Sequence, residues 1–264
     1  MPLNIQCVSD LHIEFRPGQD HSKILLPVCD ILVLAGDICP CNPIDIEIFK
    51  TFINGIISKY RMILFVAGNH ERYNSPLQDR PYSIDEIDTA ISKFCNSTDG
   101  KLVYMNNRAL VIQSEDQQYL IIGSTLWTHV PVNIQPVLNT LMNDYTKIFI
   151  GDANKIQQLQ SGYVNAMFDY NLKFIIDMVQ LSKKHNMKTV LITHHQPYVL
   201  NPKGAISHGY MSDLTFLFND IDLVLHGHTH IPVNMKIKKA KVYSNPLGYP
   251  GQNLDFKPDE KLTV

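Results

Sequence analysis

Short runs rich in Val, Ile and Leu recur along the chain, and each run ends in Gly or polar residues. The runs lack the alternation of apolar and polar residues that marks a strand with one face in water, so they are typical of strands buried on both faces. The sequence therefore predicts buried strands at residues 5–8, 31–34, 62–66, 190–192 and 223–225.

Two stretches between these runs have apolar residues at the spacing of an amphipathic helix. The first runs from Phe49 to Tyr60, after the second predicted strand, and the other runs from Met167 to Val179, directly before the strand at 190–192. Strands and helices therefore alternate in these parts of the chain. That order predicts a sheet that is at least partly parallel and is covered by helices.

The middle of the chain has a different pattern. Residues 102–104, 109–112 and 119–123 form short strand-like runs that are separated by turn residues, with no helical stripe between them. These runs predict an antiparallel second sheet. Further apolar runs at 235–237 and 242–243 are expected to be strands that can return to that sheet.

One long segment shows little periodicity. Residues 128–160 include Pro131, Pro136 and Gly151, and we expect a mobile segment or lid there. The chain has 264 residues, of which 45% are hydrophobic, so it can bury a sizeable core. Nothing marks a domain boundary, and residues 1–264 are predicted to form a single domain.

Residue types that bind metal ions follow all five predicted strands. In an α/β sheet the carboxyl ends of parallel strands meet at one edge, so these residues are expected to gather at one rim. Each motif alone is commonplace in loops and turns, but their conjunction favours a metal site. The motifs are Asp10-x-His12, Gly36-Asp37, Gly68-Asn69-His70-Glu71, Thr193-His194-His195 and His226-Gly227-His228-x-His230.

The ligand types narrow the chemistry of this site. Asp, Asn and neutral imidazole suit Mn, Fe, Zn or Mg better than Cu(I) or an iron-sulfur cluster. Two carboxylates cannot neutralise two divalent ions, so the site keeps a positive charge that can hold a phosphate. Two neighbouring ions can orient a bridging hydroxide for attack on phosphorus. We therefore expect hydrolysis of a phosphodiester or phosphomonoester, such as a nucleotide.

Three histidines of these motifs need separate interpretations. His70 follows Asn69 directly, and consecutive side chains in a loop rarely bind the same centre, so we predict that His70 is a general acid. His195 can contact the substrate or a metal-bound water, or it can support a ligand from behind. His226 is expected to be structural because it would point away from His228.

Four other residues lie in segments that could line the pocket. We interpret each of them as framework rather than as a substrate contact. They are Trp127, Asp144, His208 and Tyr210.

Charge and cysteine content indicate which partners and which cellular location to expect. The formal net charge of −2 gives no global attraction for nucleic acid or for an anionic membrane. Residues 1–15 lack the features of a signal peptide, and no run approaches the roughly 18 apolar residues of a membrane span. Five cysteines without repeated spacing favour a reduced, cytoplasmic protein.

Cys39 and Cys41 have no second pair to complete a metal site, so we interpret them as part of an ordinary loop.

The five motifs together resemble those of the calcineurin-like metallophosphoesterase superfamily. The resemblance implies a four-layer α/β/β/α sandwich of two mixed sheets flanked by helices. It also implies two divalent or mixed-valence ions, among which Mn is favoured over Fe, Zn, Ni and Mg, and it agrees with His70 as the acid. One ion would be held by Asp10, His12, Asp37 and His230, and the other by Asp37, Asn69, His194 and His228.

Other motifs relate the chain to particular branches of this superfamily. It is similar to a compact branch of single-domain members in Thr125-Leu126-Trp127-Thr128, Met142-Asn143-Asp144-Tyr145 and Asn245-Pro246-x-Gly248-Tyr249. It differs from the protein serine/threonine phosphatases, because Ile38 and Cys39 follow Asp37 and Ala67 precedes Gly68.

Two alternatives to a phosphoesterase with a small substrate remain open. One is a catalytically silent scaffold, and the other is a single-strand nuclease, which would need basic residues and stacking aromatics around the site. The basic cluster of Lys236, Lys238, Lys239 and Lys241 is better interpreted as a solvated strand or turn. We expect a small phosphate ester as partner, with no membrane and no duplex nucleic acid, and the oligomeric state stays open.

Overall fold

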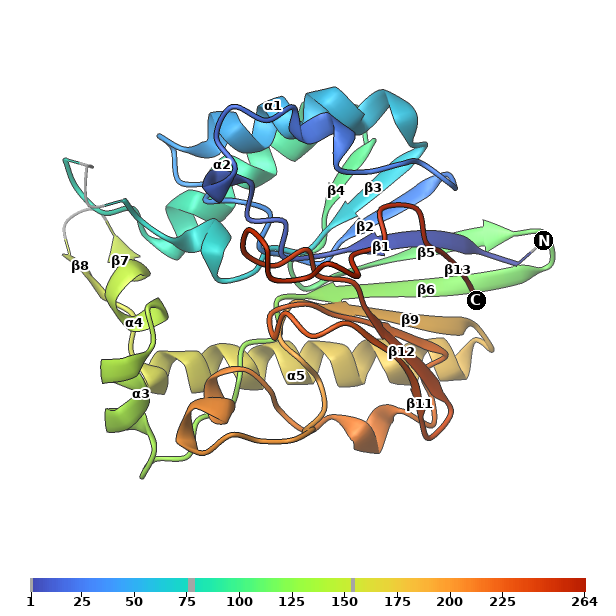
Figure 1. Ribbon diagram of the computed structural model, residues 1–264. Helices are drawn as coiled ribbons and strands as arrows, with labels where there is room; N and C mark the ends of the chain where they lie inside the picture. The colour runs from blue at the N-terminus through green and yellow to red at the C-terminus, as the bar shows by residue number, and fades with distance from the viewer. Residues whose placement is uncertain (1, 76–78, 153–154) are drawn as a thin grey trace.

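The computed structural model describes residues 2–75, 79–152 and 155–264, and these residues form four layers (Figure 1). Two sheets pack face to face. Helices α1 (Ile46–Ile56) and α2 (Ile84–Asn96) cover the outer face of the first sheet, and α5 (Ser161–Lys184) covers the outer face of the second. This arrangement confirms the predicted α/β/β/α sandwich.

The first sheet has the strand order β13-β1-β2-β3-β4. Strands β1 to β4 are parallel and β13 is antiparallel. Val8 pairs with Leu34, which pairs with Phe65, so the loops after three strands start at one level. The strands are β1 (Asn4–Val8), β2 (Ile31–Leu34), β3 (Met62–Phe65), β4 (Leu102–Tyr104) and β13 (Lys261–Thr263).

The second sheet has the strand order β11-β12-β10-β9-β6-β5. Its inner strands are parallel, while β5 and β11 at the edges are antiparallel to their neighbours. The strands are β5 (Arg108–Ser114), β6 (Gln117–Ser124), β9 (Lys188–Thr193), β10 (Leu223–Leu225), β11 (Val233–Ile237) and β12 (Ala240–Ser244).

Three predictions about the sheets were wrong. The second sheet was expected to be antiparallel, but its four inner strands are parallel. The strand at 102–104 was expected in the second sheet, but β4 pairs in parallel with β3 in the first. The five ligand-bearing strands were expected at one rim, but β9 and β10 belong to the second sheet. The reason is that a run of apolar residues reports burial on both faces and not the identity of the neighbouring strand. The strands predicted near the carboxyl end were expected to return to the second sheet, and β11 and β12 confirm this.

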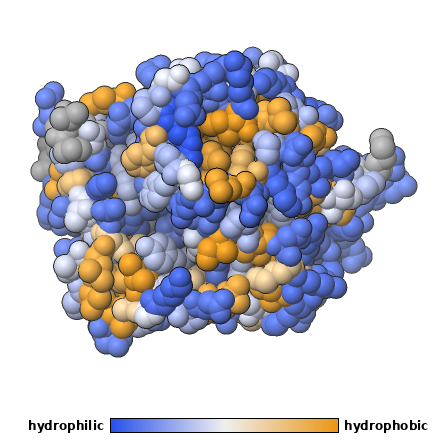
Figure 2. Space-filling model, in the orientation of Figure 1, coloured by the Kyte–Doolittle hydropathy of each residue, from blue (hydrophilic) through white to orange (hydrophobic). Residues whose placement is uncertain are grey.

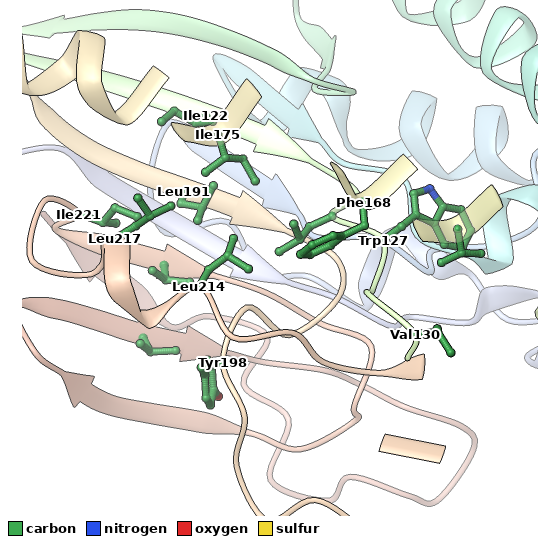
Figure 3. Packing of buried hydrophobic residues seen from close by; sticks show 14 of the residues in the cluster. Ile122, Trp127, Val130, Phe168, Ile175, Leu191, Tyr198, Leu214, Leu217 and Ile221 are labelled. Carbon is green, nitrogen blue, oxygen red and sulfur yellow. The ribbon is translucent and has the colours of Figure 1, made fainter. Parts of the chain in front are cut away.

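Side chains alternate between the layers and form three buried clusters. Those on one face of β1 to β3, such as Cys7 and Val33, meet those of the second sheet in the middle layer. The opposite face of the first sheet packs on α1 and α2. Ile122 and Leu191 of the second sheet lie near Phe168 and Ile175 of α5 (Figure 3). Apolar surfaces therefore cover both faces of each sheet, which explains the continuous apolar runs.

The segment at 128–160 contains two short helices and a pair of antiparallel strands among its described residues. The expectation of a mobile segment or lid stays a prediction. These elements are too short for helical periodicity to show in the sequence. They are α3 (Gln135–Leu141), α4 (Asp144–Lys147), β7 (Phe149–Asp152) and β8 (Lys155–Gln158).

Several short 3-10 helices join the longer elements. They are η1 (Ile13–Phe15), η2 (His21–Lys23), η3 (Ile57–Lys59), η4 (His70–Arg72), η5 (Ala205–Gly209) and η6 (Thr215–Leu217). Across the described parts of the chain, every helix is too short or too polar to cross a membrane.

Candidate metal centre

The loops after β1, β2 and β3 meet the loops after β9 and β10 where the two sheets adjoin. Contacts between the sheets hold these loops together. Nδ1 of His194 lies 2.9 Å from the carbonyl oxygen of Ala35, and the backbone N–H of His228 donates to Oδ1 of Asp10 over 2.9 Å. The predicted ligands therefore gather at a junction between two sheets.

Asp10, His12 and His230 form what we call the first ligand group. Their candidate ligand atoms all lie within 4.8 Å of one another. Nε2 of His12 is 3.0 Å from Nε2 of His230, which is 3.4 Å from Oδ1 of Asp10. All three side chains are largely buried.

The second ligand group consists of Asp37, Asn69, His194 and His228. Nε2 of His194 is at its centre, 3.0 Å from Oδ1 of Asn69 and 3.1 Å from Nδ1 of His228. The same nitrogen lies 3.3 Å from Oδ1 of Asp37. All four residues are buried.

Asp37 connects the two groups through its two carboxylate oxygens. Oδ1 faces His194 of the second group, whereas Oδ2 lies 3.9 Å from Nε2 of His12 in the first. The carboxylate also accepts a hydrogen bond of 2.9 Å from the backbone N–H of His70, which fixes its orientation. This position suits a carboxylate that bridges two ions.

The donor atoms fit divalent cations. Nδ1 of His194 donates to the carbonyl oxygen of Ala35, so in the neutral ring Nε2 carries a lone pair that faces two further acceptors, Oδ1 of Asn69 and Oδ1 of Asp37. A cation between these nitrogen and oxygen atoms would accept the lone pair that each of them offers. The mixture of imidazole, carboxylate and amide oxygen suits Mn, Fe, Zn, Ni or Mg.

Glycines in three of the motifs leave the space that the ligands occupy. A Cβ at Gly36 would lie 2.3 Å from Nδ1 of His194, and one at Gly68 would lie 2.2 Å from Oδ1 of Asp37. A Cβ at Gly227 would lie 2.6 Å from Oδ2 of Asp10. Glycine therefore occurs at these positions because any side chain would overlap with the ligand side chains.

The backbone is also unusual at the ligands. Non-glycine residues adopt positive φ uncommonly, at a cost of about 1–3 kcal/mol each, and such residues occur at turns and cluster at functional sites. Five predicted ligands are in this region: Asp10 (φ 51°), His12 (43°), Asp37 (55°), His228 (70°) and His230 (54°).

The calcineurin-like phosphoesterase family model matches residues 3–232, which include both ligand groups. This chain belongs to the calcineurin-like phosphoesterase family. An uncharacterised protein of Acanthamoeba polyphaga mimivirus is 28% identical to it over 277 residues, covering 96% of this chain and 94% of the relative.

Solved structures share the fold of this phosphoesterase. A phosphopantetheinyl hydrolase from Mycobacterium tuberculosis has a TM-score of 0.70 and 14% identity, covering 100% of this chain and 96% of that one. A dimetal phosphatase from Danio rerio has a TM-score of 0.53 and 11% identity, covering 92% and 87% of the two chains. At these identities the likeness shows the architecture alone.

Charged groups at the centre of the phosphoesterase site shift the pKa values of their neighbours. Burial alone would lower the pKa of His194, but Asp37 and Asp10 outweigh it and raise the pKa to about 9. Burial would raise the pKa of Asp37, yet His194 and His70 hold it well below its usual range. Burial and the neighbouring His195 and His194 keep the pKa of His228 well below normal, so its ring is neutral, as a ligand must be.

His70 lies beside both groups. Its Nδ1 is 3.3 Å from Oε1 of Glu14, and its Nε2 is 3.5 Å from the hydroxyl of Tyr249. Burial would lower the pKa of His70, but Asp37 and Glu14 raise it above the ordinary value. His70 also forms a convergent group with His12 and Asp37, so the geometry alone permits either an acid or a further ligand.

The sequence interpretation missed two supporting carboxylates. Glu14, two residues after His12, contacts His70 from η1. Glu71 was quoted within a motif without a role, and it accepts hydrogen bonds from the backbone N–H groups of residues 37, 38 and 68 over 2.6 to 2.9 Å. Glu71 therefore ties the loops after β2 and β3 together.

Asp144 and Tyr210 were interpreted as framework, and both line the cavity beside the centre. Oδ1 of Asp144 accepts from the side-chain amide of Asn69 over 2.8 Å and from the hydroxyl of Tyr73 over 2.6 Å. The amide of Asn69 is thereby turned so that its oxygen faces His194. No local signal in the sequence marks this pairing between residues 69 and 144.

The remaining histidines differ in position. His226 is buried, with its ring nitrogens 3.0 Å from the hydroxyl of Tyr198 and 3.1 Å from the carbonyl of Gly227, which agrees with the predicted structural role. The ring of buried His195 packs 4.2 Å from that of His228 and 5.3 Å from that of Trp127, between centroids. His195 does not line the cavity. Its predicted contact with substrate stays a prediction.

His208 and the cysteine pair lie apart from the centre. His208 is exposed on η5. Cys39 and Cys41 are buried free thiols, and Sγ of Cys41 lies 3.4 Å from the carbonyl oxygen of Cys39. Among the described residues, no convergent ligand group includes a cysteine. The interpretation of residues 39–41 as an ordinary loop agrees with this arrangement.

Proposed function

We propose that this chain hydrolyses a phosphate ester with two divalent cations, one held by each ligand group. The observation that carries the proposal is the position of Asp37, whose two oxygens face different groups. A carboxylate shared in this way would hold both ions and let them supply their chemistry to one phosphate. Mn is our first choice among Mn, Fe, Zn, Ni and Mg.

The protein's own residues set the charge and geometry of this site. When bound, the two ions supply Lewis-acid activation of water and of the phosphoryl oxygens. Asp10 and Asp37 are the carboxylates among the ligands, and they cannot neutralise two divalent ions. The imidazoles and the amide of Asn69 add no negative charge. The site therefore retains a positive charge that attracts an anionic ester.

His70 is proposed as the general acid. Its Nδ1 faces Glu14, so its Nε2 is the nitrogen that can donate a proton toward the cavity that His70 lines. Asp37 and Glu14 raise the pKa of His70, which favours the protonated form of its ring. Proton donation to the leaving alkoxide contributes typically 10²- to 10⁴-fold to the rate.

A His70→Ala variant separates the role of acid from that of ligand. We expect it to keep both ions, and to lose about 100-fold in kcat on an alkyl ester but much less on a p-nitrophenyl ester, whose leaving group needs no proton. Metal content by mass spectrometry shows whether His70 is a ligand, and kcat on both esters shows whether it is the acid. Loss of an ion, or equal loss of kcat on both esters, would argue that His70 is not the acid.

The substrate is proposed to be a small phosphate ester, such as a nucleotide. A phosphopantetheinyl ester is a second substrate to test, because the phosphopantetheinyl hydrolase has the same fold. A single-strand nuclease is less favoured, because the four lysines at 236–241 lie on the β11–β12 hairpin and none lines the cavity. Nζ of Lys239 instead pairs with Asp222 over 3.0 Å. A cytoplasmic location and the absence of membrane and duplex partners stay predictions.

The deciding experiment measures hydrolysis of p-nitrophenyl phosphate and of bis-p-nitrophenyl phosphate. Purified protein is supplied separately with Mn(II), Ni(II), Mg(II) or Zn(II). We expect turnover of at least one ester, abolished in Asp37→Asn and retained in the matched control Asp30→Asn, whose carboxylate is solvent-exposed. A catalytically silent scaffold would cleave neither ester with any ion, and that result would overturn the proposal.

A further inference from the structure

A cavity of about 550 Å³ lies beside the candidate metal centre. Its inner edge is formed by Asn69, His70, His228 and His230, so a phosphate held at the centre would lie at this edge. Cavities of about 300–1,000 Å³ hold ligands of the size of a drug molecule. A phosphate group alone would leave most of this space empty, so the cavity has room for a sizeable organic group.

Part of the wall of this cavity away from the ligands is apolar, and polar residues such as Asn143, Gln196 and Ser207 line other parts of it. Three segments that are far apart in the sequence supply most of the apolar part: the end of α3, the region of η5, and the start of β11. The apolar residues of these segments are Leu141, Met142, Ile206, Met211, Ile231 and Val233.

Some of this apolar surface is open to solvent. The side chains of Leu141 and Ile231 are 62% and 55% exposed. Figure 2 shows hydrophobic residues gathered on the surface around α3. Contiguous apolar surface that stays exposed in a folded protein commonly marks a ligand-binding site. Here it is continuous with the cavity that begins at the ligands.

Charges within the cavity are few. Among the described residues that line it, Asp144 is the only carboxylate, and it already accepts hydrogen bonds from Asn69 and Tyr73. Of the lining residues that the structure describes, Lys203 is the only lysine or arginine. Beyond the ligands, the cavity therefore carries few charges, which suits an uncharged organic group better than a second anion.

We propose that this cavity binds the organic group of the substrate, and that this group is an alkyl or aryl chain of several carbons. The inference rests on the proposed phosphoesterase activity, because it places the phosphate at the ligands and the chain along the apolar wall. Each methylene that leaves water for such a wall improves binding by up to about fourfold. The apolar wall then selects among phosphate esters.

The test compares two diesters that share one leaving group, p-nitrophenyl methyl phosphate and p-nitrophenyl hexyl phosphate, with the Mn-loaded protein. We expect kcat/KM to be at least tenfold higher for the hexyl ester. Leu141→Ser and Ile231→Ser should each lower kcat/KM for the hexyl ester at least threefold more than for the methyl ester. Leu254→Ser is the matched control, because Leu254 is exposed and lies outside the cavity, and it should change neither value.

Calorimetric binding of hexyl phosphate and methyl phosphate gives a second measurement that needs no turnover. Equal kcat/KM for the two diesters together with equal affinity for the two monoesters would overturn the apolar-chain proposal while leaving phosphoesterase activity intact. Tighter binding of hexyl phosphate without hydrolysis of either diester or of p-nitrophenyl phosphate would support the apolar wall and contradict the proposed activity. The two proposals can therefore fail separately.

Discussion

Glu14 lies between two histidines that have different proposed roles. Its Oε1 is 3.3 Å from Nδ1 of His70 and 3.4 Å from Nδ1 of His12, while its buried Oε2 has no hydrogen-bond partner within the described residues. An ionised carboxylate only accepts hydrogen bonds, so both rings carry a proton on Nδ1. Nε2 of His12 is then free to face His230, and Nε2 of His70 is directed to the leaving group.

A Glu14→Gln variant tests this positioning role. The amide keeps the shape of the side chain but removes the charge that stabilises protonated His70, so kcat on an alkyl ester should fall by about tenfold. The loss on a p-nitrophenyl ester should be smaller, with KM little changed. The control is Glu47→Gln on the exposed face of α1. Equal losses on both esters, or loss of bound metal, would contradict the role.

Protonation of His194 makes the stability of the metal-free protein depend on pH. The folded-state pKa of about 9 lies above the ordinary value of 6.5, because Asp37 and Asp10 stabilise the charged ring against burial. A raised pKa adds stability that is complete below pH 6.5 and is lost as the pH rises through 9. The raised pKa values of His70 and His230 act in the same direction.

Urea unfolding of protein dialysed against a chelator measures this effect. The free energy of unfolding should fall by on the order of 2–3 kcal/mol between pH 6.5 and pH 9.5. With Mn present the trend should reverse, because ions compete with protons for the same imidazoles and bind better as the pH rises. A stability that does not change over this range in the chelated protein would contradict the assigned charge state of His194.

At the scale of elements, the turn after β3 depends on a glycine. A Cβ on Gly68 would lie 2.2 Å from the carboxylate of Asp37 and 2.6 Å from the ring of His194. Gly68→Ala should therefore displace the second ligand group and weaken metal binding by at least tenfold, as measured by calorimetry. Gly162→Ala is the control, because nothing lies within 4 Å of its Cβ position on α5. Unchanged affinity in Gly68→Ala would contradict the steric account.

The sequence predicts some elements better than others. Buried strands show as continuous apolar runs, so β1, β2, β3, β9 and β10 were all found. Helices α1 and α5 were found by their apolar stripes. Helix α2 was missed, although its capping box at Ser83 and Glu86 is a recognisable start signal.

At the scale of the molecule, the candidate metal centre forms where the two sheets meet. Motifs next to the strands predict which residues gather, because strand ends in register bring their loops together. They do not predict that β9 and β10 belong to a different sheet from β1, since sheet membership is decided by packing between distant segments. Glu14, the contact between Asp144 and Asn69, and the apolar part of the cavity wall were not predicted for the same reason.

The central claim is that two ions, held by two ligand groups that share Asp37, are needed for hydrolysis. The most direct test titrates chelator-treated protein with Mn(II) and follows the rate of p-nitrophenyl ester cleavage against equivalents of metal. We expect the rate to reach its plateau at two Mn per chain, and Asp37→Asn to stay inactive at the same equivalents. A plateau at one Mn per chain, or full activity without metal, would contradict the account.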